Sequence, residues 1–239
     1  MKELYRKLNL THLLPLAIYF VIYLLWFRII QSIPRAHYTV LTIPADGLIP
    51  FVDVFIVPYI SWFVYVPMYV FILYFTDREA YDRLATCLII GMTAFLLIST
   101  LWPNCQVLRL EQMPRKNVFT FLVELIWSLD SPRNLFPSIH VFNTVAVWIS
   151  ARSSHSAFFA RPRRRHVLTI WCVLICLSTM LVKQHSVTDV SGALVLMLIL
   201  YVPVFRQGRY FRFRHFLSAQ DRRQELLDAL ARGEAGEEI

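Results

Sequence analysis

The sequence predicts an all-α membrane protein built as a bundle of six transmembrane helices. First, 57% of its 239 residues are hydrophobic and only 17% are charged, with a mean hydropathy of +0.52, which is too apolar for an ordinary soluble domain. Second, the chain contains six apolar runs, several of which approach the ~20 residues that span a bilayer as a helix. Third, loops rich in Lys and Arg alternate with loops that have fewer of them, as expected of a chain that crosses a membrane repeatedly.

The apolar runs set the order of the expected spans. The second run contains Tyr59, Trp62 and Tyr74, which we expect to anchor its ends at the membrane interface. The fourth run begins at Pro137 and is short for a full crossing, so its ends should lie within the protein. The six expected spans are residues 12–32, 55–75, 84–103, 137–151, 167–184 and 187–205.

The segments outside these spans are polar, basic or rich in turn formers. Together they divide the chain into an N-terminal interfacial segment (1–11), a membrane domain (12–205) and a basic, then acidic, cytoplasmic tail (206–239) with an expected helix at Gln220–Leu230. Within the membrane domain the expected loops are 33–54, a short polar loop 76–83, a long loop 104–136 and a strongly basic loop 152–166. Residues 117–129 of the long loop are apolar enough to form a helix lying on the membrane.

The distribution of positive charge predicts the orientation. The net charge of +8 could indicate nucleic-acid binding, but the cations sit in particular loops, which fits membrane orientation better. The denser set lies in the N-terminal segment, loops 76–83 and 152–166, and the tail. We therefore expect a multi-pass protein of the cell membrane with both termini in the cytoplasm. No spacing of the four cysteines suggests zinc or a disulfide framework, so we expect buried thiols.

One polar cluster stands where the fifth run ends and the sixth begins. It contains Lys183, His185 and Asp189, and ionisable groups at such a place are a functional hypothesis by default. His185 and Asp189 are four residues apart, so on a helix they share a face, and the carboxylate could hold one imidazole nitrogen and free the other as a nucleophile. The alternative is a plain helix start with Ser186 as N-cap and Asp189 three residues later.

A second cluster, DSPRNLFPSIH at 130–140, precedes the fourth run. Its proline suits the first position of a helix, where its missing N–H costs nothing. The N–H groups that follow and the helix dipole would favour an anion such as phosphate. Ser138 could donate a hydroxyl to that anion, and His140 is placed to give or take a proton. Taken alone this motif is weak, because it also describes a helix start with an interfacial histidine.

The two clusters together resemble the type 2 phosphatidic acid phosphatase superfamily. The signature of that superfamily is K-x6-R-P, then P-S-G-H, then S-R-x5-H-x3-D; here PSIH at 137–140 is followed by Ser178, His185 and Asp189 at matching spacing. The extended strings NLFPSIHVFN and VKQHSVTDVSG are similar to the branch with bacterial lipid phosphatases and inositol phosphorylceramide synthase-like proteins. The resemblance covers about residues 12–205 and implies six helices. The candidate residues all fall on the side with the smaller set of cations, so we expect the site on the non-cytoplasmic face.

The chain departs from this signature at three places. Ile139 replaces the glycine of the second motif, although only its backbone N–H is needed. In the first motif Arg109 matches the arginine, but Leu110 follows it and Trp102 stands at the lysine position. In the third motif Thr179 replaces arginine. Lys183 lies four residues after Thr179, so on a continuing helix it would project from the same face, and we expect it to supply the missing cation.

The resemblance implies a role for each matching residue and no metal or cofactor. His185 would attack the phosphorus of a lipid phosphate and form a phosphohistidine, Asp189 would hold the imidazole, and His140 would protonate the departing oxygen and then activate water. The residues expected to bind phosphate are Arg109, Lys183 and Ser138, and Asn134 and Arg133 are possible substrate contacts.

Two other functions fit the same residues. A lipid phosphotransferase would share the phosphohistidine step and pass the phosphoryl-linked head group to an alcohol instead of water. A non-enzymatic transporter or metal-binding protein would use His140, His185 and Asp189 as a proton relay or as a two-histidine, one-carboxylate metal site. No inverted repeat is evident in the sequence, and Lys183 and Arg109 favour an anion over a metal ion.

Overall fold

The computed structural model describes residues 13–213 and 227, and this part of the chain is predominantly helical. Five of its helices are long and apolar enough to cross a membrane: Leu14–Ser32 (α2), Asp53–Thr76 (η2 with α4), Arg78–Leu101 (α5), Pro162–Leu181 (α9) and Val187–Arg206 (α10 with the π-helix η3). The fourth expected span is the helix Ile139–Arg152 (α7), which has 14 residues and is too short to count with the others. The expected N-terminal segment and the tail helix lie outside the described residues.

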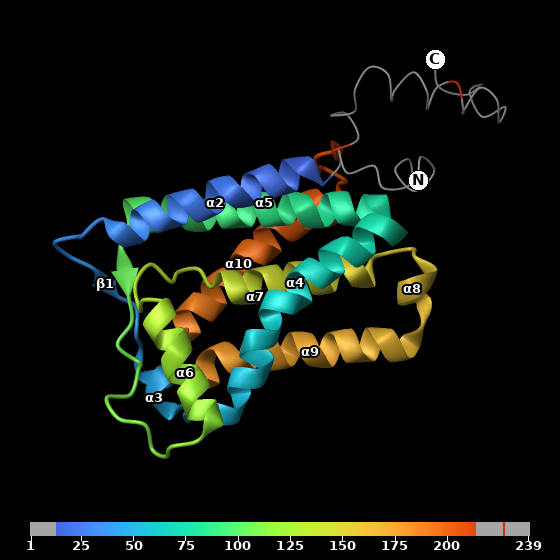
Figure 1. Cartoon of the computed structure of the whole chain (residues 1–239). Coiled ribbons are helices and arrows are strands. Elements are labelled where there is room, and N and C mark those ends of the chain that lie inside the picture. The colour runs from blue at the N-terminus through green and yellow to red at the C-terminus, as the bar shows by residue number, and fades with distance from the viewer. Residues whose placement is uncertain (1–12, 214–226, 228–239) are drawn as a thin grey trace, which may run out of the picture.

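The short helix α7 forms the centre of the bundle. It contacts α4, α5, α9 and α10, and its buried side chains include Val141, Phe142 and Val147. Those four long helices surround α7, while α2 packs on the outer side of α5 (Figure 1). Because α7 is enclosed by protein, its polar first turn is shielded both from lipid and from bulk water.

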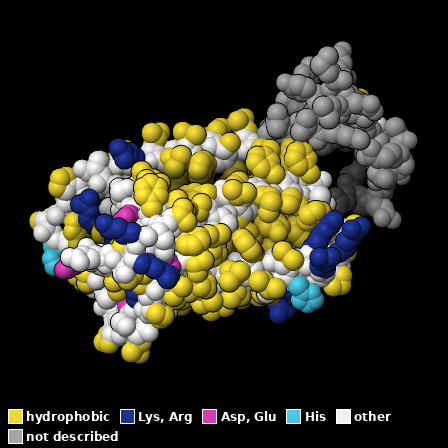
Figure 2. Space-filling model, turned by 60° about the horizontal axis from the view of Figure 1, so that its bottom comes forward, with side chains coloured by type: hydrophobic (Ala, Val, Ile, Leu, Met, Phe, Trp, Pro, Cys, Tyr) yellow, Lys and Arg dark blue, Asp and Glu magenta, His cyan; other side chains and the backbone are white. Residues whose placement is uncertain are grey.

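The outer surface of the bundle suits a bilayer. Large apolar side chains are exposed along the long helices, for example Leu25 in α2, Val64 in α4 and Ile170 in α9. Figure 2 shows hydrophobic side chains covering the middle of the visible face, with Lys and Arg gathered toward its two ends. An apolar band between two charged ends is what a membrane-embedded protein requires.

Several short elements gather at one end of the bundle. They are the helix Pro44–Leu48 (α3), the 3₁₀ turn Asp53–Phe55 (η2), the helix Val118–Leu129 (α6) and a parallel pair of two-residue strands, Thr39–Val40 (β1) and Asn104–Cys105 (β2). The helix Ala157–Ala160 (α8) lies at the opposite end (Figure 1). The sequence predicted α6, whose N-cap Asn117 accepts the N–H of Thr120 at 2.9 Å. It did not predict the strands, α3 or α8.

Two expected loops turned out to be largely helical. The polar stretch 76–83 was expected as a loop, but α5 already begins at Arg78, because Asp77 caps it by accepting the N–H of Ala80 at 3.0 Å. Glu79 and Arg83 then form an ion pair one turn apart. Similarly, α9 begins at Pro162 rather than at 167, with that proline in its first turn.

Close packing between α5 and α7 depends on a glycine. A Cβ atom at Gly91 would overlap the ring of Phe142, which is almost fully buried. We expect Gly91→Ala to destabilise the protein by about 1–3 kcal/mol, the usual cost of overpacking a core. Thermal unfolding in detergent measures this. Gly47→Ala is the matched control, because its added methyl group would meet no atom within 4 Å. Equal unfolding temperatures for the two variants would contradict the packing argument.

Candidate active site

The two clusters singled out in the sequence meet at the start of α7. His140 lies in the first turn of α7, and His185 lies in the connection from α9 to α10. The Nδ1 atom of His140 is 3.2 Å from the Nε2 atom of His185, although the residues are 45 positions apart in sequence. The backbone fixes this junction as well, since the N–H of Ser138 donates to the carbonyl oxygen of Asp189 at 3.0 Å. Both imidazoles are buried.

Asp189 serves both the helix cap and the histidine. The N–H of Ser186 donates to Asp189 Oδ2 at 2.9 Å, and the N–H of Asp189 donates to the Ser186 hydroxyl at 3.1 Å, which is a capping box. The same Oδ2 lies 3.4 Å from Nδ1 of His185. The helix-start interpretation and the catalytic interpretation are therefore compatible. His185 itself precedes α10, so the contact arises from the cap and not from two residues sharing a helix face.

The second cluster differs from expectation in one detail. We expected Pro137 at the first helical position, but α7 begins at Ile139 and Ser138 is its N-cap. The Ser138 hydroxyl accepts the N–H of Val141 at 3.3 Å, because this N–H has no carbonyl partner within the helix. Its own proton stays available as a donor.

Lys183 does not reach the histidines, and the expectation that it lies on the face of Thr179 is wrong. Helix α9 ends at Leu181, and Lys183 has φ of 56°, so the chain turns away before Lys183. Its Nζ donates to the carbonyl oxygens of Asp46 and Ile49, at 3.1 and 2.5 Å. Burial lowers the pKa of the Lys183 amine, against the opposing charge of Asp46.

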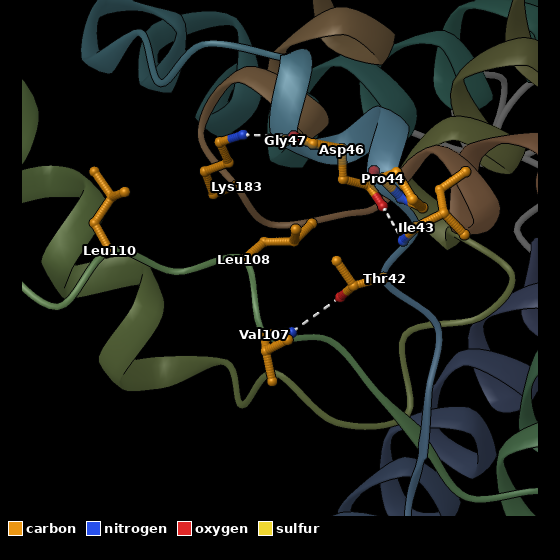
Figure 3. Close-up of a pocket in the computed structure, with 9 residues that line it drawn as sticks. All are labelled: Thr42, Ile43, Pro44, Asp46, Gly47, Val107, Leu108, Leu110 and Lys183. Atoms are coloured by element: carbon orange, nitrogen blue, oxygen red, sulfur yellow. Dashed lines mark hydrogen bonds between the residues drawn. The ribbon is translucent and has the colours of Figure 1, made fainter.

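Lys183 instead borders a hollow beside α3 (Figure 3). The hollow has a volume of about 560 Å³, and its lining is mainly apolar, including Pro44, Val107, Leu108 and Leu110. None of the three catalytic candidates lines it. Asp46 ties α3 to the start of α10, since its Oδ1 accepts the N–H of Val187 at 2.7 Å. The lysine and Asp46 thus fasten α3 to the connection that carries His185.

Arg109 lies closer to the histidines, but its donors are largely occupied. It donates to the carbonyl oxygens of Trp127 and Asp130, at 2.7 and 2.5 Å, and to Oε1 of Gln184 at 3.1 Å. Its Nε–H has no partner among the described residues. Burial lowers the pKa of the guanidinium, an effect that the charge of Asp130 opposes. This contact ties Arg109 to Gln184, the residue that directly precedes His185.

Asn134 and Arg133, the possible substrate contacts, interact with other parts of the protein and not with the histidine pair. Asn134 is buried in a left-handed conformation with φ of 55°, and its N–H donates to the carbonyl oxygen of Asn104. The guanidinium of Arg133 lies over the ring of Tyr38 at 5.6 Å. Neither contact involves the histidine pair.

Two residues near the histidines, Tyr59 and Gln184, were not expected from the sequence. Tyr59 was predicted to be an interface anchor, but it is buried and its hydroxyl lies 3.2 Å from Nε2 of His140. Tyr74 was predicted to have the same role and is also buried. Gln184 donates from Nε2 to Asp130 Oδ2 at 2.9 Å. Burial raises the pKa of the Asp130 carboxyl, against the charges of His185 and Arg109. No periodicity marks these residues, since only the fold brings them together.

The geometry does not suit a metal ion. Asp189 approaches Nδ1 of His185 while His140 approaches Nε2 of the same ring, so the three side chains do not face a common point. Within residues 13–213 no group of three or more His, Cys, Asp or Glu side chains is arranged to hold a metal.

Comparisons with known proteins add no relatives. No protein-family model, curated protein or solved structure matches the chain.

Proposed function

We propose that this protein is a membrane lipid phosphate phosphatase that acts through a phosphohistidine intermediate. The observation that carries the proposal is the buried array of Asp189, His185 and His140, joined by contacts of 3.4 and 3.2 Å. A carboxylate on one nitrogen of an imidazole and a second imidazole beside the other nitrogen supply an oriented nucleophile and a proton carrier. The resemblance to the phosphatase superfamily independently assigns the same three residues to these roles.

The reaction follows in two steps. In the first, the Nε2 lone pair of His185 attacks phosphorus, the N–P bond forms, and the P–O bond to the lipid breaks. Protonated His140 gives its proton to the leaving oxygen, while Asp189 stabilises the positive charge on His185. In the second, neutral His140 takes a proton from water as the water oxygen attacks phosphorus. The P–N bond then breaks and inorganic phosphate leaves.

Charge on the phosphate oxygens must also be balanced. Arg109 balances this charge by donating to a phosphate oxygen in place of the neutral Gln184 amide. The new hydrogen bond is charge-assisted and therefore stronger than the one it replaces. The N–H groups of the first turn of α7 other than that of Val141, together with the Ser138 hydroxyl, complete the set of donors. Such fixed donors supply much of the stabilisation in phosphoryl transfer.

The arrangement of charge supports a site on the non-cytoplasmic side. The first turn of α7 and the α9–α10 connection, which carry the two histidines, lie at the end of the bundle that holds α3 and α6, opposite α8 (Figure 1). The arginines of 152–165 lie at the α8 end, and four of the five fall within residues 161–165. By the positive-inside rule the α8 end is cytoplasmic, in the cell membrane, with both chain termini on that side.

The proposal is tested by assaying the purified protein in detergent or nanodiscs against a panel of lipid phosphates. We expect release of inorganic phosphate that survives EDTA, because guanidinium and N–H donors take the place of a metal ion's charge. The assay is repeated with alcohol acceptors, since appearance of a phosphodiester or transferred phosphate would identify a phosphotransferase instead. Loss of activity with EDTA and its rescue by a divalent ion would contradict the metal-free mechanism.

A further inference from the structure

The hydroxyl of Tyr59 lies on the far side of the His140 ring from His185. It is 3.2 Å from Nε2 of His140, whereas His185 faces Nδ1. The rings of Tyr59 and His140 also stack, with their centroids 4.9 Å apart. The ring of Trp62 packs on His140 as well, with a centroid distance of 4.3 Å. Tyr59 and His140 come from α4 and α7, so the contact joins two helices at the site.

Asp189, His185, His140 and Tyr59 form a row of hydrogen-bonding groups. Their contacts determine which group donates and which accepts in each hydrogen bond of this row. An ionised Asp189 can only accept, so Nδ1 of His185 must carry a proton. Nε2 of a neutral His185 is then an acceptor, and Nδ1 of His140 must donate to it. In a neutral His140 the remaining nitrogen, Nε2, is also an acceptor, and Tyr59 must donate to it.

This row also describes a closed site. The lone pair of His185 that would attack phosphorus already accepts the N–H of His140. Both imidazoles are buried, and the hollow beside α3 does not include them. A phosphate group must therefore enter between the two rings, and His140 must then keep its orientation without the support of His185.

We propose that Tyr59 is the positioning residue that keeps the His140 ring in its orientation when substrate separates the two histidines. A hydroxyl is suited to this task because it both donates and accepts. It donates to Nε2 while His140 is neutral with its proton on Nδ1, and it accepts from Nε2–H once His140 is protonated. Nδ1 stays directed at the reacting phosphate in both states. This role rests on the proposed phosphatase function.

The test compares Tyr59→Phe with a matched control on the same helix. Tyr65→Phe removes an equally buried hydroxyl that has no hydrogen-bond partner among the described residues. Turnover is measured with an alkyl phosphate lipid, whose leaving oxygen needs a proton, and with p-nitrophenyl phosphate, whose leaving group does not. For Tyr59→Phe we expect kcat to fall about tenfold or more with the lipid, part of the ~10²–10⁴ supplied by general acid–base catalysis, and much less with the aryl ester. Tyr65→Phe should leave both rates unchanged.

A second measurement separates this role from the function itself. In protein with ¹⁵N-labelled histidine, the imidazole signals of His140 report its tautomer, and we expect Tyr59→Phe, but not Tyr65→Phe, to shift them. If the wild-type protein hydrolyses neither ester, the proposed function fails. The imidazole signals alone then show whether Tyr59 orients His140. If Tyr59→Phe shifts no signal, or slows both esters equally, Tyr59 does not position His140.

Discussion

Replacing His185 by alanine is expected to abolish both turnover and covalent labelling of the protein. Substrate carrying labelled phosphate should transfer the label to the wild-type protein, and the adduct should be labile in acid and stable in alkali, as a phosphoramidate is. Among the described residues, only His185 has a carboxylate beside one ring nitrogen and a second imidazole, that of His140, beside the other. Quenched labelling followed by acid and alkali treatment measures the result.

His140→Ala separates nucleophile from proton carrier. It should slow lipid turnover severely, yet it should still permit labelling from a substrate whose leaving group needs no proton. His37→Ala is a suitable control, since His37 lies in the loop after α2, outside the histidine pair. Turnover that persists in His185→Ala, together with no labelling of His140→Ala, would show that the roles are exchanged or that water attacks directly.

The second large effect is expected from Asp189→Asn. An asparagine oxygen in the place of Oδ2 can still accept the N–H of Ser186, so the cap of α10 and the fold should persist. What is lost is the negative charge 3.4 Å from Nδ1 of His185, which stabilises this ring as it becomes positive in the transition state. The equivalent change in a serine protease triad costs ~10⁴ in kcat, and we expect a loss of that order here.

A variant that damages only the cap provides the control for Asp189→Asn. Ser186→Ala removes the hydroxyl that accepts the N–H of Asp189, at a typical cost of ~1 kcal/mol in stability. We expect its unfolding temperature to fall more than that of Asp189→Asn while its kcat falls far less. If the two variants lose activity in proportion to their loss of stability, Asp189 acts only as a capping residue.

Much of the helical layout could be predicted because apolar runs and proline positions are local signals. Helix α2 ends at Ser32 and α10 begins at Val187, as the runs indicated. The polar first turns of α5 and α9 were missed, because a cap and an ion pair extend α5, and a first-turn proline starts α9, before the apolar run begins. The two-residue strands depend on pairing of Thr39 with Asn104, which a local pattern does not reveal.

The candidate site shows the same division. The resemblance to the phosphatase signature implied a common site for His140, His185 and Asp189, and the fold brings these side chains together. Lys183 was misplaced because the prediction assumed that α9 continues past Leu181. Tyr59 was missed because its position on an apolar helix resembles that of any interface tyrosine. Only the packing of α4 against α7 directs its hydroxyl to His140, 81 residues away.

In the proposed phosphatase, the length of α7 sets the depth at which the histidine pair meets a lipid phosphate. Fourteen residues of α-helix extend roughly 21 Å, while the hydrocarbon layer is ~30 Å thick. If α7 is centred in the bilayer, its first turn lies several ångströms below the lipid carbonyl level, with His140 in that turn. A lipid phosphate must then move below the membrane surface to reach the histidine pair, or the adjacent leaflet must thin around the protein. Bilayer thickness would thus become a control on turnover, and nanodiscs made from shorter acyl chains should hold the ester nearer to the histidine pair.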